Sequence, residues 1–135
     1  MMQLPTAGLL VVQHRKLLLA YSRNKECFYL PGGKVDKGET PVSALCREVA
    51  EEMNVTISEH ELEHHTHITA PAYGEENGII MEQDCFFLHR TITPEPSAEI
   101  GELKYFSLSD YLSETNRAPG AVMILELLQR EGLID

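Results

Sequence analysis

The amino-acid sequence predicts one domain of mixed α and β structure, of the α/β or α+β class. Three observations support this prediction: short β-prone runs recur along the chain, two longer segments have helical periodicity, and no linker or internal repeat divides residues 1–135. Strands and helices mixed in this way pack as the layers of a sandwich. With 135 residues, the chain is long enough to bury its own core without disulfides.

The first third of the chain predicts three short strands. Residues 7–12 and 16–21 are apolar and β-prone, and polar residues 13–15 separate them, so we expect a hairpin or two sequential strands. Residues 27–30 form a third run. Pro31-Gly32-Gly33 ends it, because proline and glycine interrupt regular structure.

A helix is predicted over residues 41–53. Thr40 precedes Pro41, and a threonine N-cap followed by proline at the first helical position is a typical helix start. Asn54 stands where a left-handed residue commonly ends a helix. Spacings of three and four residues give this helix one apolar face, formed by Val42, Leu45, Cys46, Val49 and Met53.

The second half of the chain predicts three strands and a helix. The strands are expected over residues 62–71, 79–90 and 103–108, with a turn at residues 74–78. The helix is expected over residues 119–130, where the apolar positions are Val122, Ile124, Leu125 and Leu128.

The distribution of charge limits the possible partners. The net charge is −10, from 21 acidic and 11 basic residues, and this surplus opposes binding to nucleic-acid polymers or anionic membranes. Residues 1–55 carry six acids and seven bases, whereas residues 56–103 carry ten acids and one base. We therefore expect an anionic substrate to bind within the first 55 residues, or through a cation.

The cysteines and the apolar segments indicate the compartment. Cys27, Cys46 and Cys85 are odd in number and lack a CxxC spacing, which fits a reducing environment. The N-terminus has no signal-peptide pattern, and the apolar runs are too short to span a membrane. We expect a cytoplasmic protein.

Three glutamates lie on one face of the helix predicted over residues 41–53. Glu48, Glu51 and Glu52 occupy positions i, i+3 and i+4, so their carboxylates are neighbours and repel one another. A hard divalent cation such as Mg²⁺ offsets this repulsion, and it binds carboxylates together with substrate phosphates. Arg47 can orient a carboxylate and keep it ionised. The alternative is a solvated acidic helix face.

The glycine-rich loop before this helix favours the metal-binding interpretation. Gly32, Gly33 and Gly38 allow the backbone to approach a ligand closely, and the helix N-terminus behind them attracts anions. Gly33 and Gly38 have the spacing of a Walker P-loop, but Glu39 stands where that motif requires lysine. A carboxylate beside a phosphate indicates a metal ion between the two.

Residues 33–55 closely resemble the Nudix box, a pattern of 23 residues. One position departs from it, because Asn54 replaces the last glycine, and asparagine tolerates the left-handed conformation best after glycine. Eight positions fit in register: Gly33, Glu39, Arg47, Glu48, Val49, Glu51, Glu52 and Val55.

The resemblance to this family, in particular to its MutT-like members, implies an α/β/α sandwich with a mixed β-sheet. It also implies Mg²⁺- or Mn²⁺-dependent hydrolysis of a nucleoside diphosphate linked to another group. Arg47 would orient the glutamates. The metal-site residues implied by the resemblance are Glu48, Glu51 and Glu52 as ligands, the carbonyl of Gly32 as a further ligand, and Glu39 as a nearby carboxylate.

A second acidic segment, residues 97–106, resembles the stretch that precedes an aromatic pair in this family. In some members a glutamate of this loop binds metal or acts as general base, and here Glu99 fits best, with Glu102 second. A metal ion lowers the pKa of a bound water, and Glu51, Glu52 or Glu99 would take its proton. The alternative is an exposed acidic loop.

Three residues are candidates for substrate binding. Arg23 and Lys34 are expected to hold the outer phosphates, because they lie in the segment with a positive charge balance. Asn116, just before the last predicted helix, is a candidate for contacting a purine edge, with a loop or capping role as the alternative.

The short chain resembles family members that hydrolyse nucleoside triphosphates, including oxidised ones, to the monophosphate. ADP-ribose or a dinucleoside polyphosphate is the alternative substrate, because Pro71 and Tyr73 follow Val55 by 16 and 18 residues, near positions that such members use. A non-catalytic nucleotide sensor is a further alternative, although the box glutamates favour an enzyme. We expect a monomer or a homodimer.

Overall fold

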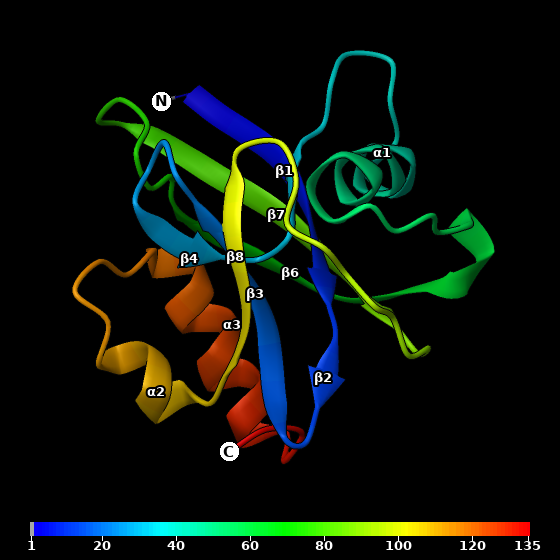
Figure 1. Ribbon diagram of the computed structural model, residues 1–135. Helices are drawn as coiled ribbons and strands as arrows, with labels where there is room; N and C mark the ends of the chain where they lie inside the picture. The colour runs from blue at the N-terminus through cyan, green and yellow to red at the C-terminus, as the bar shows by residue number, and fades with distance from the viewer. Residues whose placement is uncertain (1) are drawn as a thin grey trace.

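A computed structural model describes residues 2–135, which form two four-stranded sheets with helices around them (Figure 1). The first sheet has the order β5-β1-β7-β6 and contains β1 (Met2–Leu10), β5 (Gly32–Lys34), β6 (Leu62–Pro71) and β7 (Ile79–Leu88). Because β1 and β7 are parallel and the other two pairs are antiparallel, this sheet is mixed. The second sheet is antiparallel and contains β2 (Val12–Gln13), β3 (Lys16–Ser22), β4 (Cys27–Tyr29) and β8 (Ile100–Phe106).

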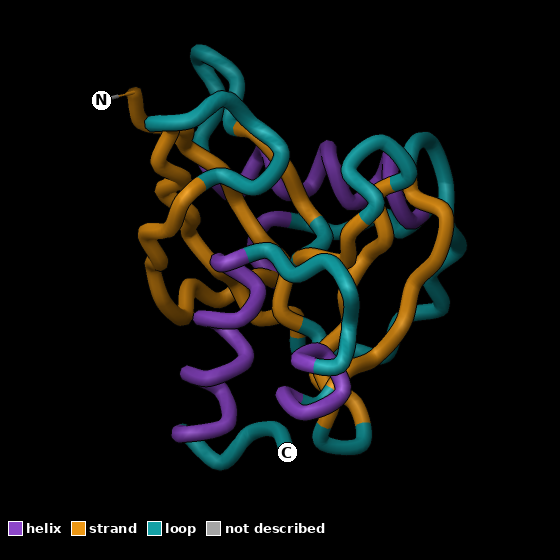
Figure 2. Tube along the Cα trace, turned by 90° about the vertical axis from the view of Figure 1, so that its left-hand side faces the viewer, coloured by secondary structure: helices purple, strands orange, loops and turns teal. Residues whose placement is uncertain are grey.

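The two longer helices, α1 (Pro41–Met53) and α3 (Pro119–Arg130), lie on opposite sides of the strands (Figures 1 and 2). Alternate residues of β1 explain this arrangement, because successive side chains of a strand point to opposite faces. Leu9 packs with Val49 of α1, whereas Leu10 packs with Leu125 of α3. The predicted α/β/α sandwich with a mixed sheet is confirmed.

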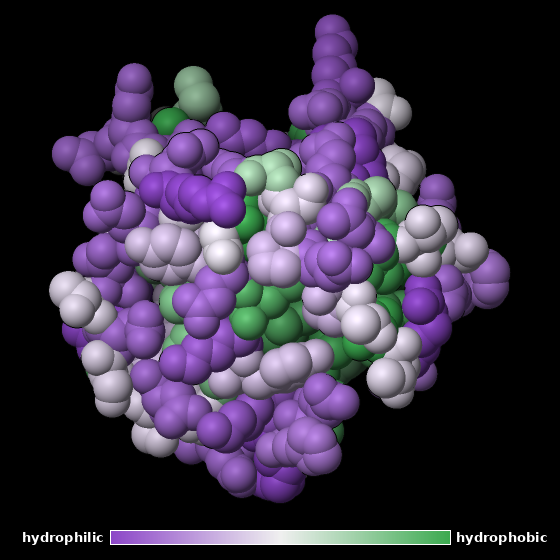
Figure 3. Space-filling view, in the orientation of Figure 1, coloured by the Kyte–Doolittle hydropathy of each residue, from purple (hydrophilic) through white to green (hydrophobic). Residues whose placement is uncertain are grey.

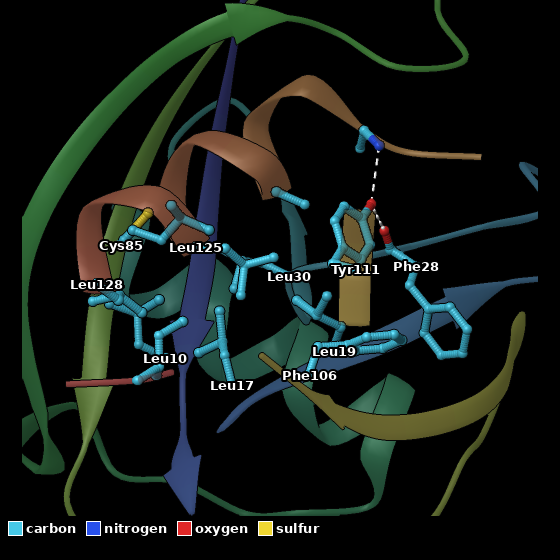
Figure 4. Packing of buried hydrophobic residues seen from close by; sticks show 14 of the residues in the cluster. Leu10, Leu17, Leu19, Phe28, Leu30, Cys85, Phe106, Tyr111, Leu125 and Leu128 are labelled. Atoms are coloured by element: carbon cyan, nitrogen blue, oxygen red, sulfur yellow. Dashed lines mark hydrogen bonds between the residues drawn. The ribbon is translucent and has the colours of Figure 1, made fainter. Parts of the chain in front are cut away.

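Tyr111 connects three segments within the larger apolar core (Figure 4). It belongs to the short helix α2 (Leu108–Leu112) and is fully buried. Its hydroxyl donates to the carbonyl of Phe28 on β4 and accepts a 2.9 Å hydrogen bond from the backbone N–H of Ala118, the residue before α3. This hydroxyl therefore fixes the start of α3 against the second sheet.

The predicted bounds of the helix over residues 41–53 are confirmed, and so are its end signals. Thr40 Oγ1 accepts a hydrogen bond of 3.1 Å from the N–H of Ser43, and Ser43 Oγ accepts one from the N–H of Thr40. Asn54 ends the helix in the left-handed region, with φ 55°. The helix that carries the glutamates thus has both ends capped.

Four sequence predictions need correction in detail. Strand β7 ends at Leu88, short of the predicted residue 90. The chain changes sheet after β1, so the predicted hairpin is β2 with β3, and β1 pairs elsewhere. Gly32–Lys34 does not only interrupt the chain but forms β5 against β1. Strand β8 ends at Phe106, short of the predicted residue 108, because the Ser107 side chain caps α2 by accepting a hydrogen bond from the N–H of Asp110.

Hydrophilic residues cover most of the face seen in Figure 3, around a smaller apolar area near its middle. None of the helices in residues 2–135 has the length and apolar character of a membrane span. Cys27, Cys46 and Cys85 are free thiols.

Candidate active site

Glu52, near the end of α1, is a buried carboxylate with a fixed position. Its side chain is 6% exposed, and Oε1 accepts a hydrogen bond of 3.0 Å from the backbone N–H of Gly32 on β5. Burial raises the pKa of Glu52 to about 8, and the nearby negative charges of Glu48, Glu99 and Glu51 contribute further. A cation placed beside this carboxylate would relieve both effects.

Glu48 lies one turn earlier on the same face of α1. Its Oε1 accepts a hydrogen bond of 2.6 Å from Nη1 of Arg47. Burial raises the pKa of the Glu48 carboxyl, although Arg47 opposes this shift. A Cβ atom at Gly33 would lie 2.6 Å from the Glu48 carboxylate, so the glycine leaves the space that this carboxylate fills.

Arg47 joins the helix to the loop before it. Its Nε and Nη2 donate hydrogen bonds of 2.9 Å to the two carboxylate oxygens of Glu39, and Nη2 also donates to the carbonyl of Lys34 at 3.2 Å. The hydrogen bonds from Arg47 lower the pKa of Glu39 to about 2. Glu51 lies 3.7 Å from Arg47, and its side chain is 56% exposed. Arg47 thus contacts three of the four glutamates singled out in the box.

A cavity of about 420 Å³ opens beside Glu48 and Glu52. Five of the predicted site residues line it: Gly32, Lys34, Glu48, Glu52 and Glu99. The others lie outside the lining, namely Arg23, Glu39, Arg47, Glu51, Glu102 and Asn116. The structure therefore brings the late acidic loop to the same cavity as the box.

Glu99 reaches this cavity from the loop before β8. Its Oε2 accepts a hydrogen bond of 2.7 Å from Nδ2 of Asn24, and its carbonyl accepts one of 3.0 Å from the N–H of Arg23. The Arg23 guanidinium donates to the carbonyl of Ala98 at 2.9 Å. Arg23 therefore contacts the backbone of the loop that carries Glu99. Glu102 lies on β8, paired with Tyr21 of β3.

Asn116 is held at the edge of the second sheet. Its Nδ2 donates a hydrogen bond of 2.7 Å to the carbonyl of Glu26. This contact joins the segment before α3 to the loop before β4, which matches the loop role considered as the alternative.

The sequence did not predict that Lys25 and Glu75 form an ion pair at the cavity. Glu75 lies 3.2 Å from Nζ of Lys25 and 3.4 Å from Nζ of Lys34, and all three residues line the cavity. The Lys25 ammonium also lies 5.6 Å from the centre of the Tyr29 ring. The positive balance of residues 1–55 could have indicated Lys25, but nothing local pointed to Glu75.

The carboxylates of α1 have the chemistry of a metal site. Within residues 2–135, no group of three or more His, Cys, Asp or Glu side chains is arranged to hold a metal ion. The donor set nevertheless fits Mg²⁺ or Mn²⁺, because both ions prefer oxygen ligands. Burial raises the pKa of both Glu48 and Glu52, and a bound cation would favour the ionised form of each carboxyl.

Comparisons with known proteins identify the family and the fold. The model of the NUDIX domain family matches residues 2–128. A MutT NUDIX hydrolase from Burkholderia pseudomallei has a TM-score of 0.75 at 22% identity, over 93% of this chain and 98% of that chain. The comparison with curated proteins gives no match.

Two further solved structures contain small nucleotide ligands. A bifunctional NMN adenylyltransferase/ADP ribose pyrophosphatase from Francisella tularensis, complexed with AMP and a Mn ion, has a TM-score of 0.70 at 20% identity, over 96% of this chain and 42% of that chain. The NUDIX domain of Shewanella oneidensis NrtR, complexed with ADP ribose, has a TM-score of 0.69 at 19% identity, over 96% and 87%.

Identities this low establish a shared fold, while the family model covers nearly the whole chain. The resemblance seen in residues 33–55 is thereby confirmed. The chain belongs to the NUDIX family, and family and fold together support its assignment as a Nudix pyrophosphohydrolase.

Proposed function

We propose that the protein is a Mg²⁺- or Mn²⁺-dependent hydrolase that converts a nucleoside triphosphate, oxidised nucleotides included, to the monophosphate. The observation that carries this proposal is the composition of one cavity. Glu48, Glu52 and Glu99 line it together with Lys25 and Lys34. The carboxylates can bind a cation, and the neighbouring ammonium groups can bind phosphates. The cavity therefore suits a substrate with several negative charges.

The glutamates and the arginine of the box each have a role in this proposal. The metal would be held by Glu48, Glu51 and Glu52 and by the carbonyl of Gly32; when bound, it neutralises phosphate charge and acidifies water. Arg47 orients Glu48, to which it donates a 2.6 Å hydrogen bond, and Glu39 holds Arg47 through two bonds.

The remaining roles concern the proton and the phosphates. Glu52, Glu51 or Glu99 accepts the proton of the attacking water, because a general base must lie within hydrogen-bond reach of that proton. Lys34 faces the phosphates from β5. Arg23 and Asn116 stay candidates for substrate contact, and their present hydrogen bonds to Ala98 and Glu26 give them a second role in positioning loops.

ADP-ribose and dinucleoside polyphosphates are the second class of substrate. This alternative is supported by Pro71 and Tyr73, which both line the cavity, and by the ADP ribose bound in the NrtR domain. A nucleotide sensor without turnover is less well supported, because all four box glutamates are present.

The test is incubation with Mg²⁺ and a panel of nucleoside triphosphates, ADP-ribose and dinucleoside polyphosphates, with chromatographic identification of products. We expect a nucleoside monophosphate and pyrophosphate from at least one triphosphate. Glu52→Gln should lower the rate by roughly 100- to 10,000-fold, whereas the exposed Glu126→Gln should keep it. Release of products from no member of the panel would overturn the proposal.

Two further predictions concern the protein as a whole. We propose a cytoplasmic location, to which the free thiols Cys27, Cys46 and Cys85 are suited. A monomer or a homodimer remains the expected state, and sedimentation at several concentrations distinguishes them.

A further inference from the structure

Two buried polar side chains face each other on the sheet that forms one wall of the cavity. Thr6 of β1 and Gln83 of β7 are register partners in the parallel pair, and both line the cavity. They are 7% and 8% exposed. Within residues 2–135, Thr6 Oγ1 is the one fully buried side-chain nitrogen or oxygen without a hydrogen-bond partner.

Such a hydroxyl requires an explanation, because a buried polar group without a partner destabilises the fold. Valine has nearly the same shape and would fill this position without that cost. Alternation along the strand places Leu4 and Thr6 on the cavity side, while Ala7 packs with the α1 side of the core. The Thr6 side chain thus lies on the face of the sheet that lines the cavity.

The Gln83 carboxamide lies close to Gly8 of β1. A Cβ atom at Gly8 would lie 3.1 Å from the carboxamide carbon and nitrogen, so the missing side chain leaves room for Gln83 across β1. The Gln83 carbonyl oxygen accepts only a long contact of 3.9 Å from Sγ of Cys85, among its contacts within residues 2–135. A carboxamide offers one acceptor and two donors, most of which therefore stay available.

The remaining wall near this pair is apolar and closely packed. Leu4 and Met81 are the neighbouring register partners, and both line the cavity. A Cβ atom at Gly120, in the first turn of α3, would lie 2.6 Å from Cε of Met81. The strands and the start of α3 therefore form one part of the cavity wall, in which the side chains supplied by β1 and β7 are neutral.

The sheet also fixes how far Thr6 and Gln83 lie from Lys34, the residue proposed to face the phosphates. Lys34 of β5 pairs with Thr6, which in turn pairs with Gln83, and all three line the cavity. Neighbouring strands lie about 4.8 Å apart, so Lys34 and Gln83 are separated by roughly 10 Å across the sheet. This suits a ligand whose phosphates lie near Lys34 and whose other end reaches Gln83.

We propose that Thr6 and Gln83 recognise the hydrogen-bonding edge of a neutral, planar heterocycle, the nucleobase of the substrate. This inference rests on the proposed function. The Thr6 hydroxyl and the Gln83 carboxamide can each donate or accept, so together they match an edge that carries neighbouring donors and acceptors. A charged end group would find no counter-charge among the side chains of β1 and β7 that line the cavity, and it would be disfavoured there.

The kinetic test compares Thr6→Val and Gln83→Leu with wild type on the preferred nucleoside triphosphate and on ribose 5-triphosphate, which lacks the base. Each variant should raise KM for the nucleotide by roughly 3- to 10-fold, the range for one lost hydrogen bond, with little change in kcat. Neither should change KM for ribose 5-triphosphate. Thr69→Val and Gln129→Leu are matched controls, because both residues are exposed and outside the cavity lining. Equal KM values for wild type and both variants on the nucleotide would overturn the inference.

A second measurement does not depend on turnover or metal. Single nucleosides without phosphate, titrated into ¹⁵N-labelled protein with chelator present, should shift the side-chain amide resonances of Gln83, and Thr6→Val should weaken that binding. Thr6→Val should also be at least as stable as wild type, and measuring this stability verifies that the variant folds. If no nucleoside shifts the Gln83 resonances, the inference is wrong even where hydrolysis occurs. If nucleosides bind and no panel substrate is cleaved, the proposed function fails while the base site stands.

Discussion

The backbone N–H of Gly32 lies 3.0 Å from Oε1 of the buried Glu52, and this hydrogen bond joins β5 to α1. Gly32 has φ 137°, and a Cβ atom there would lie 2.0 Å from the carbonyl oxygen of Ala7. Residue 32 must therefore be glycine if β5 is to pair with β1 and also donate to Glu52. One backbone position thus couples the sheet to the carboxylates of the candidate active site.

Gly32→Ala should destabilise the protein by more than the roughly 1–2 kcal/mol that a left-handed backbone costs an L-residue. The excess comes from the contact with Ala7, because backbone atoms have to move to relieve it. Gly38→Ala is the matched control: Gly38 has φ 88°, but nothing lies within 4 Å of its added Cβ. Urea denaturation of both variants measures the difference. Equal losses of unfolding free energy would show that the contact with Ala7 is relieved without cost.

Mg²⁺ or Mn²⁺ should raise the unfolding temperature, because a ligand that binds the folded state stabilises it. At a free ion concentration 100 times Kd the gain is about 2.7 kcal/mol. A chelator should reverse it. The double variant Glu48→Gln with Glu52→Gln should lose the response, and Glu126→Gln should keep it. If the metal raised the unfolding temperature of the double variant as much as that of wild type, these two glutamates would not be metal ligands.

Arg47→Lys should weaken metal binding by roughly 10- to 100-fold, the usual effect of removing a residue that orients metal ligands. Lysine keeps the charge but cannot make the two parallel hydrogen bonds that Arg47 makes to Glu39. Titration with Mn²⁺ measures the affinity, and Arg130→Lys, at the exposed end of α3, is the control. Unchanged Mn²⁺ affinity in Arg47→Lys would argue against an orienting role.

His67 should make stability depend on pH. Its Nε2 lies 2.7 Å from Oε1 of Glu82 and its Nδ1 lies 3.0 Å from Oδ1 of Asp84, so both ring nitrogens act as donors when the ring is charged. These hydrogen bonds, the one to Glu82 first, raise the pKa of His67 above its ordinary value.

The direction of the pH dependence follows from the linkage between proton binding and folding. The folded-state pKa lies above the unfolded one, so the stabilisation is complete below about pH 6.5 and is lost as the pH rises through the folded-state pKa. Urea denaturation between pH 5.5 and 8.5 should therefore show wild type approaching His67→Gln in stability as the pH rises. Glu82→Gln should show the same trend more weakly, because one partner remains. A constant difference between wild type and His67→Gln across this range would contradict the assignment.

Local signals in the sequence determined the two longer helices and the box. Thr40, Pro41 and Asn54 act on their own neighbours, so the bounds of α1 could be predicted to the residue. The same holds for α3 and for β6, whose bounds match the predicted ranges. The spacing of Glu48, Glu51 and Glu52 placed them on one face, because helix geometry depends on sequence separation alone.

The tertiary structure decided what depends on partners far along the chain. The division of the strands into two sheets, and the pairing of Gly32–Lys34 with β1, are set by contacts between segments that carry no local signal for each other. Glu99 reaches the cavity only because β8 pairs with β3, and Arg23 bonds the Ala98 carbonyl for the same reason. Asn116 bonds the carbonyl of Glu26, which is also distant in the sequence. Thr6 and Gln83 are adjacent because the parallel strands β1 and β7, which are far apart in the sequence, align them. The sequence thus determined the family and the carboxylates, while only the packing of distant strands determined the shape and polarity of the cavity beside them.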